Sequence, residues 1–264
     1  MSNNIAVTVA DGIADVRLDR PEKLNGLTLP MLRGLADAAH ELRGDRSLRA
    51  VILFGAGDSF CAGLDFKTVT ADPKQLPLGM IPRPWRGTNV FQEACWAWRR
   101  VPVPVIAAVH GHCYGGGVQI ALGADLRVTA PDAKWSVLEG KWGLIPDMSG
   151  VQALSELVGI ETAKRLTMTA EIISGEEAAR LGLVGQLAPE PYDAARALAH
   201  QLTRRSPDAL VAAKRLFDGT WRSSARHTFA RERWEQTKLL LGANFRIART
   251  AGLKREEPVF RARR

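Results

Sequence analysis

One stretch, HGHCYGGGVQIALGAD at residues 110–125, constrains this chain more than any other. The apolar run over 101–109 before it predicts a buried strand, and residues 118–122 after it are typical of a helix. The glycines at 115–117 remove every Cβ from the turn between them, so a ligand can approach main-chain N–H groups at the positive end of the helix. The stretch predicts a binding turn for an anion, or for an oxygen that becomes one, with a plain packing turn as the alternative.

A second strand end of the same kind lies upstream. The apolar run 49–54 continues through Gly55-Ala56-Gly57-Asp58 into FCAGLDFK at 60–67, so two strand ends each offer glycine-exposed amides. FCAGLDFK followed by HGHCYGGGVQ resembles the enoyl-CoA hydratase/isomerase (crotonase) superfamily. The resemblance also takes in RPEKLNGL at 20–27 and LEGKWGLIPD at 138–147, and it spans residues 5 to 190 in consistent order.

The resemblance implies an α/β fold, the crotonase-like spiral of ββα units, with a C-terminal helical region. The local signals agree with it. Alternating runs around Asp11-Gly12 predict a hairpin, Thr28 and Pro30 begin a helix that stops at Gly44, and strands follow at 125–129 and 134–137. From residue 188 the chain is expected to be helical to its end. We expect an acyl-CoA-binding core over 1–195 and a helical oligomerisation region over 196–264.

Composition narrows the class of protein and its partners. With 264 residues, 46% hydrophobic and 24% charged, the chain is typical of a soluble globular protein. No leader-like segment and no apolar run of ~20 residues stands out, so we expect a cytoplasmic protein without membrane attachment. The net charge is +8, but the basic residues do not alternate with aromatic residues in the way typical of nucleic-acid binding. The positive charge suits a small polyanion such as coenzyme A. The three cysteines lack metal-type spacing, which predicts buried thiols and no metal.

Coenzyme A is expected as the thioester part of the substrate, with no separate cofactor. By resemblance, Lys23 and Leu24 touch its nucleotide end, although an exposed loop lysine is the alternative. The proline-rich stretch after Lys67, with Pro73, Pro77, Pro82 and Pro84, is expected to be a loop along the acyl pocket. Its apolar residues are candidates for gripping the acyl chain: Leu76, Leu78, Met80, Ile81 and Trp85. The expected substrate and CoA contacts are Lys23, Leu24, Ala62, Gly63, Leu64, Asp65, Phe66, Lys67, Gly115 and Gly116.

The chemistry implied is stabilisation of a thioester enolate. A thioester's α-proton is too weakly acidic to leave unless the enolate oxygen is bound, and each preorganised N–H donor contributes ~3–4 kcal/mol in comparable oxyanion holes. By resemblance, the backbone amides of Leu64 and Gly116 are these donors. Because the main chain supplies the hydrogen bonds, the side chain at position 64 is free to vary.

Three residues are candidates for moving protons. Family hydratases carry a glutamate two residues after the glycine triplet, where this chain has Gln119, and an amide cannot accept a proton at neutral pH. The second family glutamate is retained as Glu139. Asp147 stands where several isomerases of the superfamily have an acid, and the alternative is that it caps the helix after Pro146.

Three functions stay open at this point. We prefer double-bond isomerisation of an enoyl- or dienoyl-CoA, with Glu139 and Asp147 as acid-base residues. The alternatives are a 2-enoyl-CoA hydratase in which Gln119 orients water, and a catalytically silent CoA-binding protein. Large apolar residues in the tail, and the resemblance, imply a homotrimer or a dimer of trimers; the residues are Phe229, Trp234, Leu239, Leu240, Leu241 and Phe245.

Overall fold

The computed structural model describes residues 3–71 and 75–264, so Pro73 lies outside the described residues. In that part of the chain, a six-stranded sheet has the order β1-β2-β3-β4-β6-β9, and a three-stranded sheet has the order β5-β7-β8. The strands are β1 Ile5–Ala10, β2 Ile13–Leu18, β3 Ala50–Gly55, β4 Val105–Val109, β5 His112–Tyr114, β6 Leu126–Thr129, β7 Lys134–Ser136, β8 Ile173–Ser174 and β9 Gln186–Leu187.

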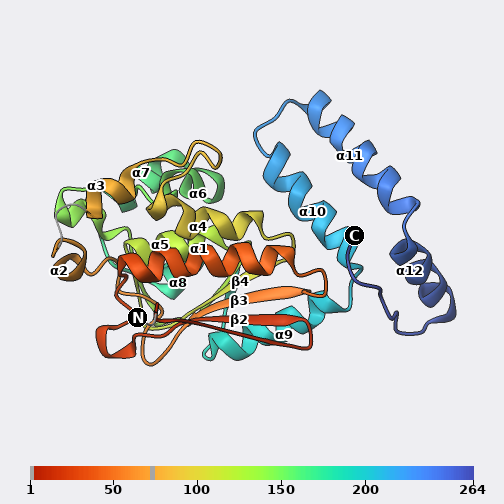
Figure 1. The fold of residues 1–264 in the computed structure, drawn as a ribbon, viewed down its shortest axis with the longest axis horizontal. Helices are drawn as coiled ribbons and strands as arrows, with labels where there is room; N and C mark the ends of the chain where they lie inside the picture. Colours follow the sequence, from red (N-terminus) through yellow and green to blue (C-terminus); the bar gives the residue numbers. More distant parts are fainter. Residues whose placement is uncertain (1–2, 72–74) are drawn as a thin grey trace.

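Helices cover both faces of the larger sheet. Figure 1 shows α1 and α4 over one face and α9 beneath the other. The helices are η1 Pro21–Lys23, α1 Leu29–Gly44, α2 Phe66–Val69, α3 Gln75–Met80, α4 Val90–Arg100, α5 Gly116–Gly123, η2 Leu138–Trp142, α6 Gly150–Leu157, α7 Ile160–Thr169, α8 Gly175–Arg180, α9 Pro191–Thr203, α10 Pro207–Thr220, α11 Ala225–Leu240 and α12 Ala243–Lys254.

Strand β3 shows why this sheet is buried on both sides. Its sequence AVILFG has no polar alternation, which is the pattern of a parallel strand covered on both faces. Leu53 packs into the cluster formed with α1, α4 and α5, whereas Ile52 packs with Ala195 and Ala199 of α9 on the opposite face. The period of two along the strand therefore sends alternate side chains into two separate cores.

The local signals at several element ends are confirmed. Strands β1 and β2 pair antiparallel around Asp11 and Gly12, which have φ values of 53° and 75° and so fit the two-residue turn. The Thr28 side chain accepts a hydrogen bond from Met31 N at the start of α1, and Ser206 caps α10 in the same way. These caps set where the two helices begin.

Three sequence-based expectations are wrong. The proline-rich stretch is not loop throughout, because α3 forms over 75–80. The strand expected over 101–109 begins only at Val105, because Val101 ends α4 as its C-cap. The chain is not helical to its end, because residues 255–264 follow α12 without regular structure, and Arg263 Nη2 donates to the carbonyls of Arg43 (2.8 Å) and Asp45 (2.7 Å).

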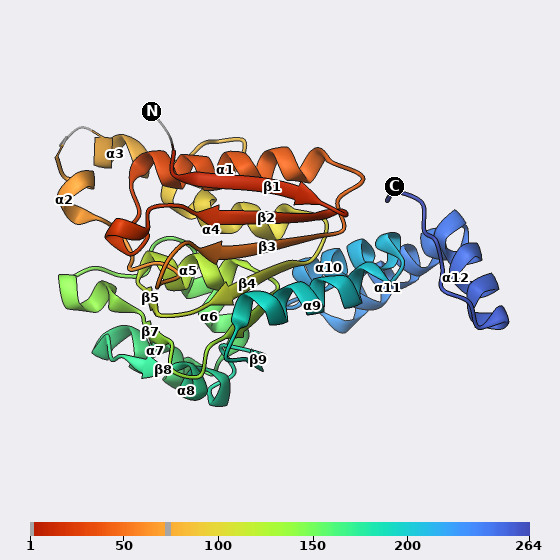
Figure 2. The ribbon, with the colours of Figure 1, turned by 90° about the horizontal axis from the view of Figure 1, so that it is seen from below.

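The C-terminal helices form an arm. Helices α11 and α12 project away from the sheets, as both views show (Figures 1 and 2), and α10 joins them to the core, where Lys214 bonds to Trp98 O and Asp125. The boundary expected at residue 195 falls inside α9, which packs on the sheet; a separate role for the arm in assembly stays a prediction. Among the described residues, every helix is too short or too polar to span a bilayer.

Candidate active site

The two glycine turns identified in the sequence lie side by side. Cys61 N donates to His112 O and Tyr114 N donates to Cys61 O, both at 2.9 Å, so residues 60–62 run parallel to 112–114. Gly63 has φ +91°, and a Cβ there would lie 2.9 Å from Tyr114 O and 3.7 Å from Gly116 N. Glycine is therefore required at position 63 both for the backbone conformation and for the close approach.

The amides of Leu64 and Gly116 are free to bind a ligand oxygen. Gly116 is the first residue of α5, and Gly115 before it has φ +50°, so the Gly116 N–H has no intrahelical acceptor. Within residues 3–71 and 75–264, neither N–H donates to another group. Both residues border the same cavity, and the arrangement offers two backbone donors for one developing oxyanion.

The cavity beside these amides has a volume of about 480 Å³. Its lining is mostly apolar, and Glu139 and Asp147 are its ionisable side chains. The lining residues are Ala62, Gly63, Leu64, Phe66, Thr70, Leu76, Met80, Phe91, Gly115, Gly116, Leu138, Glu139, Trp142, Leu144, Ile145, Asp147 and Met148.

The predicted acyl-chain contacts are placed only in part. Leu76 and Met80 line the cavity, but Leu78, Ile81 and Trp85 do not, and they are 64%, 60% and 79% exposed. The sequence analysis did not predict the remaining residues of the lining, which are Thr70, Phe91 of α4, Leu138, Trp142, Leu144, Ile145 and Met148. Phe91 has the spacing of an ordinary core residue of a helix, and no local sequence signal indicated that it reaches the cavity.

Glu139 lies in η2, directly after the strand end at β7. Its Oε1 accepts a hydrogen bond of 2.6 Å from Gln119 Nε2, while Oε2 is buried without a hydrogen-bond partner among the described residues. Burial raises the pKa of this carboxyl and the charge of Asp147 adds to the effect, while the Gln119 hydrogen bond opposes it. A carboxyl with one uncommitted oxygen and a raised pKa is suited to accepting and returning a proton.

Gln119 holds this part of the site together. It is fully buried in α5, and its Oε1 accepts from Met148 N (2.8 Å) and Gly150 N (2.9 Å). Two backbone donors at Oε1 fix the orientation of the amide, so its NH₂ group faces Glu139. A Cβ at Gly150 would stand 2.6 Å from Gln119 Oε1, which explains glycine at the start of α6.

Asp147 is half-buried and does not cap a helix. Helix α6 begins at Gly150, and its N-cap is Ser149, which has φ 72° and makes no side-chain capping bond. The capping alternative is therefore wrong, and the carboxyl lines the cavity instead. Burial raises the pKa of Asp147 as well. The cavity thus holds two carboxyls that the fold biases toward protonation.

Six of the residues expected near coenzyme A line the cavity (Ala62, Gly63, Leu64, Phe66, Gly115 and Gly116), and Lys23, Leu24, Asp65 and Lys67 are not part of its lining. Ala62 N donates to Leu24 O at 2.9 Å, which ties the loop carrying Lys23 to the first glycine turn. Lys23 and Lys67 are exposed. Asp65 pairs with Arg20 at 2.8 Å and caps α2, so its position is set by structure around it. Contact of these residues with coenzyme A stays a prediction.

Metal ligands are not grouped in the part of the chain that the structure describes: no three His, Cys, Asp or Glu side chains are placed to share an ion. The three cysteines are free and buried, and burial raises the pKa of Cys61 to about 12. Cys61 and Cys113 beside the turns are therefore packing residues, as expected.

Two uncommitted backbone amides, a mostly apolar cavity and a buried carboxyl are features expected of a site that binds an acyl thioester. The enoyl-CoA hydratase/isomerase family model matches residues 8–263, and the chain belongs to this family. Because its relatives are named as enzymes of the hydratase and isomerase type, the chain is an acyl-CoA enzyme of that type.

Individual relatives carry different reaction names. The chain is 33% identical to a probable enoyl-CoA hydratase of Rhodobacter capsulatus, with 99% of each chain covered. It is 34% identical to the mitochondrial Delta(3,5)-Delta(2,4)-dienoyl-CoA isomerase of Homo sapiens, over 76% of this chain and 64% of that protein. The structure superposes on enoyl-CoA hydratase EchA1 of Mycobacterium marinum with a TM-score of 0.86 and 30% identity, covering 98% and 99% of the two chains. The crotonase-like fold class is confirmed.

Proposed function

We propose that this protein shifts a double bond in an enoyl- or dienoyl-CoA. The observation that carries the proposal is the amide at position 119: its oxygen accepts from two backbone donors, and one N–H of its NH₂ group donates to Glu139. Family hydratases have a glutamate at both positions and activate water with two carboxylates. In this chain Glu139 is one carboxylate, and the amide of Gln119 stands in place of the other. A second carboxyl, Asp147, also lines the mostly apolar cavity.

The proposed reaction needs no water. The Glu139 carboxylate takes a proton from C2 of a 3-enoyl-CoA, and the electron pair moves to the thioester oxygen, where the Leu64 and Gly116 amides bind it. The resulting dienolate takes a proton back at C4, which leaves the double bond between C2 and C3. With a 3,5-dienoyl-CoA, protonated Asp147 adds its own proton at C6, which leaves double bonds at C2–C3 and C4–C5. Glu139 then releases the C2 proton and Asp147 takes one up by exchange with solvent, which restores the starting state.

A second candidate function is hydration of a 2-enoyl-CoA. One N–H of Gln119 remains after its bond to Glu139, and it would orient a water that Glu139 deprotonates. The hydratase names among the relatives favour this alternative. A catalytically silent protein would bind acyl-CoA without turnover.

We also propose that the chain assembles through its C-terminal arm as a trimer, alone or paired. The arm exposes more large apolar side chains than expected of a segment surrounded by water. The exposed fractions are 54% for Phe229, 59% for Trp234, 49% for Leu240 and 71% for Leu241.

Parallel assays with 3-enoyl-, 3,5-dienoyl- and 2-enoyl-CoA test the reaction. We expect double-bond migration in the first two and poor hydration of the third. Asp147→Asn should slow the dienoyl reaction by ~100-fold or more, the usual scale of acid-base catalysis, and affect the 3-enoyl reaction less. Efficient hydration of 2-enoyl-CoA that Asp147→Asn leaves unchanged would refute the isomerase assignment. CoA binding without turnover in all three assays would support the silent alternative.

A further inference from the structure

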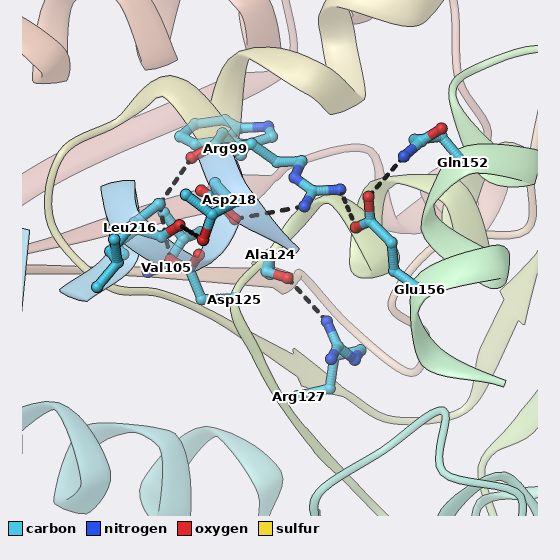
Figure 3. Close-up of polar contacts among 12 residues, drawn as sticks. Arg99, Val105, Ala124, Asp125, Arg127, Gln152, Glu156, Leu216 and Asp218 are labelled. Carbon is cyan, nitrogen blue, oxygen red and sulfur yellow. Dashed lines mark hydrogen bonds and ion pairs between the residues drawn. The ribbon is translucent and has the colours of Figure 1, made fainter. Parts of the chain in front are cut away.

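A network of charged side chains joins three helices behind the active site. Arg99 of α4 reaches Glu156 of α6 with Nη1 at 2.6 Å and Asp218 of α10 with Nη2 at 3.3 Å (Figure 3). The side chains of Arg99 and Glu156 are each 16% exposed. Gln152 Nε2 donates to the other carboxylate oxygen of Glu156 at 2.6 Å, so both oxygens are held.

Helix α6 connects this network to Gln119. It has eight residues and is ~12 Å long, and Glu156 lies in its last turn. Gly150, its first residue, donates to Gln119 Oε1, and Gln119 in turn donates to Glu139. Because two helical turns move as a unit, a shift at the Glu156 end also moves the Gly150 end.

Helix α10 also bonds to the segment that follows α5, the helix that carries Gln119. Lys214 Nζ pairs with Asp125 at 2.7 Å and donates to the carbonyls of Trp98 (3.1 Å) and Val103 (3.2 Å). Asp125 lies two residues beyond the end of α5, the helix that carries Gln119. One helix of the C-terminal arm is thus bonded to Asp125 after α5 directly and to α6 through Arg99.

We propose that Arg99 and Lys214 are positioning residues of the active site. Together with Asp218, Glu156 and Asp125, they form a clamp by which α10 sets the spacing of α5 and α6. That spacing determines whether the Met148 and Gly150 amides reach Gln119 and thereby where Glu139 stands. The inference rests on the proposed function only in that Glu139 carries the substrate proton.

A double-mutant cycle tests the clamp, with Glu156→Gln as the first change because glutamine keeps the size of the side chain. The assay is exchange of the C2 proton of a saturated acyl-CoA with solvent deuterium. Glu139 takes the proton, the enolate oxygen rests on the two amides, and a deuteron returns to C2, so the step is common to isomerases and hydratases. Glu156→Gln should lower kcat ~10-fold with KM within twofold, since misplacement of ~1 Å can cost up to ~100-fold.

The second half of the double-mutant cycle introduces Glu156→Gln into the Gln119→Ala variant. If the clamp acts through Gln119, Glu156→Gln should then have less than a twofold effect, whereas equal losses in both backgrounds would overturn the proposal. Arg180→Gln is a control for the loss of an arginine–glutamate pair as such: its pair with Glu177 has the same 2.6 Å length and lies in α8, where the Arg180 side chain is 70% exposed. It should leave kcat unchanged.

Amide hydrogen exchange gives a readout that does not depend on turnover. Glu156→Gln and Asp218→Asn should each speed exchange of the Met148 and Gly150 amides, and Arg180→Gln should not. Unchanged exchange at these two amides in both clamp variants would overturn the proposal. A wild-type protein without C2 exchange would instead contradict the role of Glu139, and the amide measurement then decides on the clamp by itself.

Discussion

Gln119→Glu is the substitution that distinguishes the two candidate reactions most directly. One oxygen of the new carboxylate can keep the Met148 and Gly150 donors. The other takes the place of Gln119 Nε2, which lies 2.6 Å from Glu139 Oε1. A donor facing an acceptor thus becomes two acceptors facing each other, and one proton must lie between them at neutral pH.

The size of the effect follows from the geometry. With charge centres ~4 Å apart and an effective dielectric constant of ~20, two ionised carboxylates repel by ~4 kcal/mol. The pair therefore keeps a proton in the folded protein that both groups release when unfolded. Because the folded state binds more protons, stability falls as pH rises from about 4.3, the unperturbed glutamate pKa, through the raised folded pKa. A loss of ~4 kcal/mol corresponds to a fall of ~10 °C in Tm for a chain of this size.

Thermal melts of the wild type and Gln119→Glu between pH 5 and 8 measure this loss, and hydration of 2-enoyl-CoA is assayed over the same range. The variant should lose Tm relative to wild type as pH rises and should gain hydration. The double variant Gln119→Glu with Glu139→Gln is the control, since it restores one amide beside one carboxylate and should return the pH dependence of Tm to that of the wild type. A Tm difference independent of pH would refute the reasoning.

Four further outcomes are expected. Glu139→Gln should abolish turnover with CoA affinity intact, and it should raise stability at alkaline pH, because the raised pKa of the buried carboxyl makes its ionised form unfavourable there; calorimetry and melts measure both. Gly117→Ala places a Cβ 2.5 Å from Cys61 O, so it should displace α5 and lower kcat by ~100-fold or more in a steady-state assay. Acyl-CoA should bind more tightly than the same acyl group on a short thiol, with salt weakening the difference through Lys23 and Lys67, and equal calorimetric affinities would contradict this. Light scattering at micromolar concentration should give an oligomer, and a monomer would count against the arm as an interface.

The sequence predicted the parts of the site that the main chain builds. Glycine at 63 and 115–117 is a local signal, because a positive φ or a close backbone approach excludes other residues at that position itself. Glu139 and Gln119 followed from the resemblance to the superfamily, whose hydratases carry glutamates at these two positions after the glycines. The hairpin at Asp11-Gly12 and the cap at Thr28 were predictable for the same reason, since each depends on a few neighbouring residues.

The cavity wall was less predictable because it depends on tertiary packing. Phe91 has the spacing of a core residue in α4, and only the packing of α4 beside α3 turns it toward the cavity. Trp85 and Ile81 have the composition of a lipophilic wall yet remain exposed. Apolar character specifies that a side chain can be buried, but it does not specify against which partner.

Glu139 shows how the fold sets the reactivity of a carboxyl at a cost in stability. Among the residues that the structure describes, Glu139 Oε2 is buried without a hydrogen-bond partner, and leaving such a group unsatisfied costs about 1–3 kcal/mol. A hydrogen-bond donor placed beside Oε2 would remove that cost, but it would also lower the pKa of Glu139 and occupy the oxygen that takes the substrate proton in the proposed reaction. Gln119 stabilises only the other oxygen, and its own orientation is fixed by backbone N–H groups that cannot be substituted away. The arrangement therefore keeps Glu139 in place while leaving one of its oxygens available for chemistry.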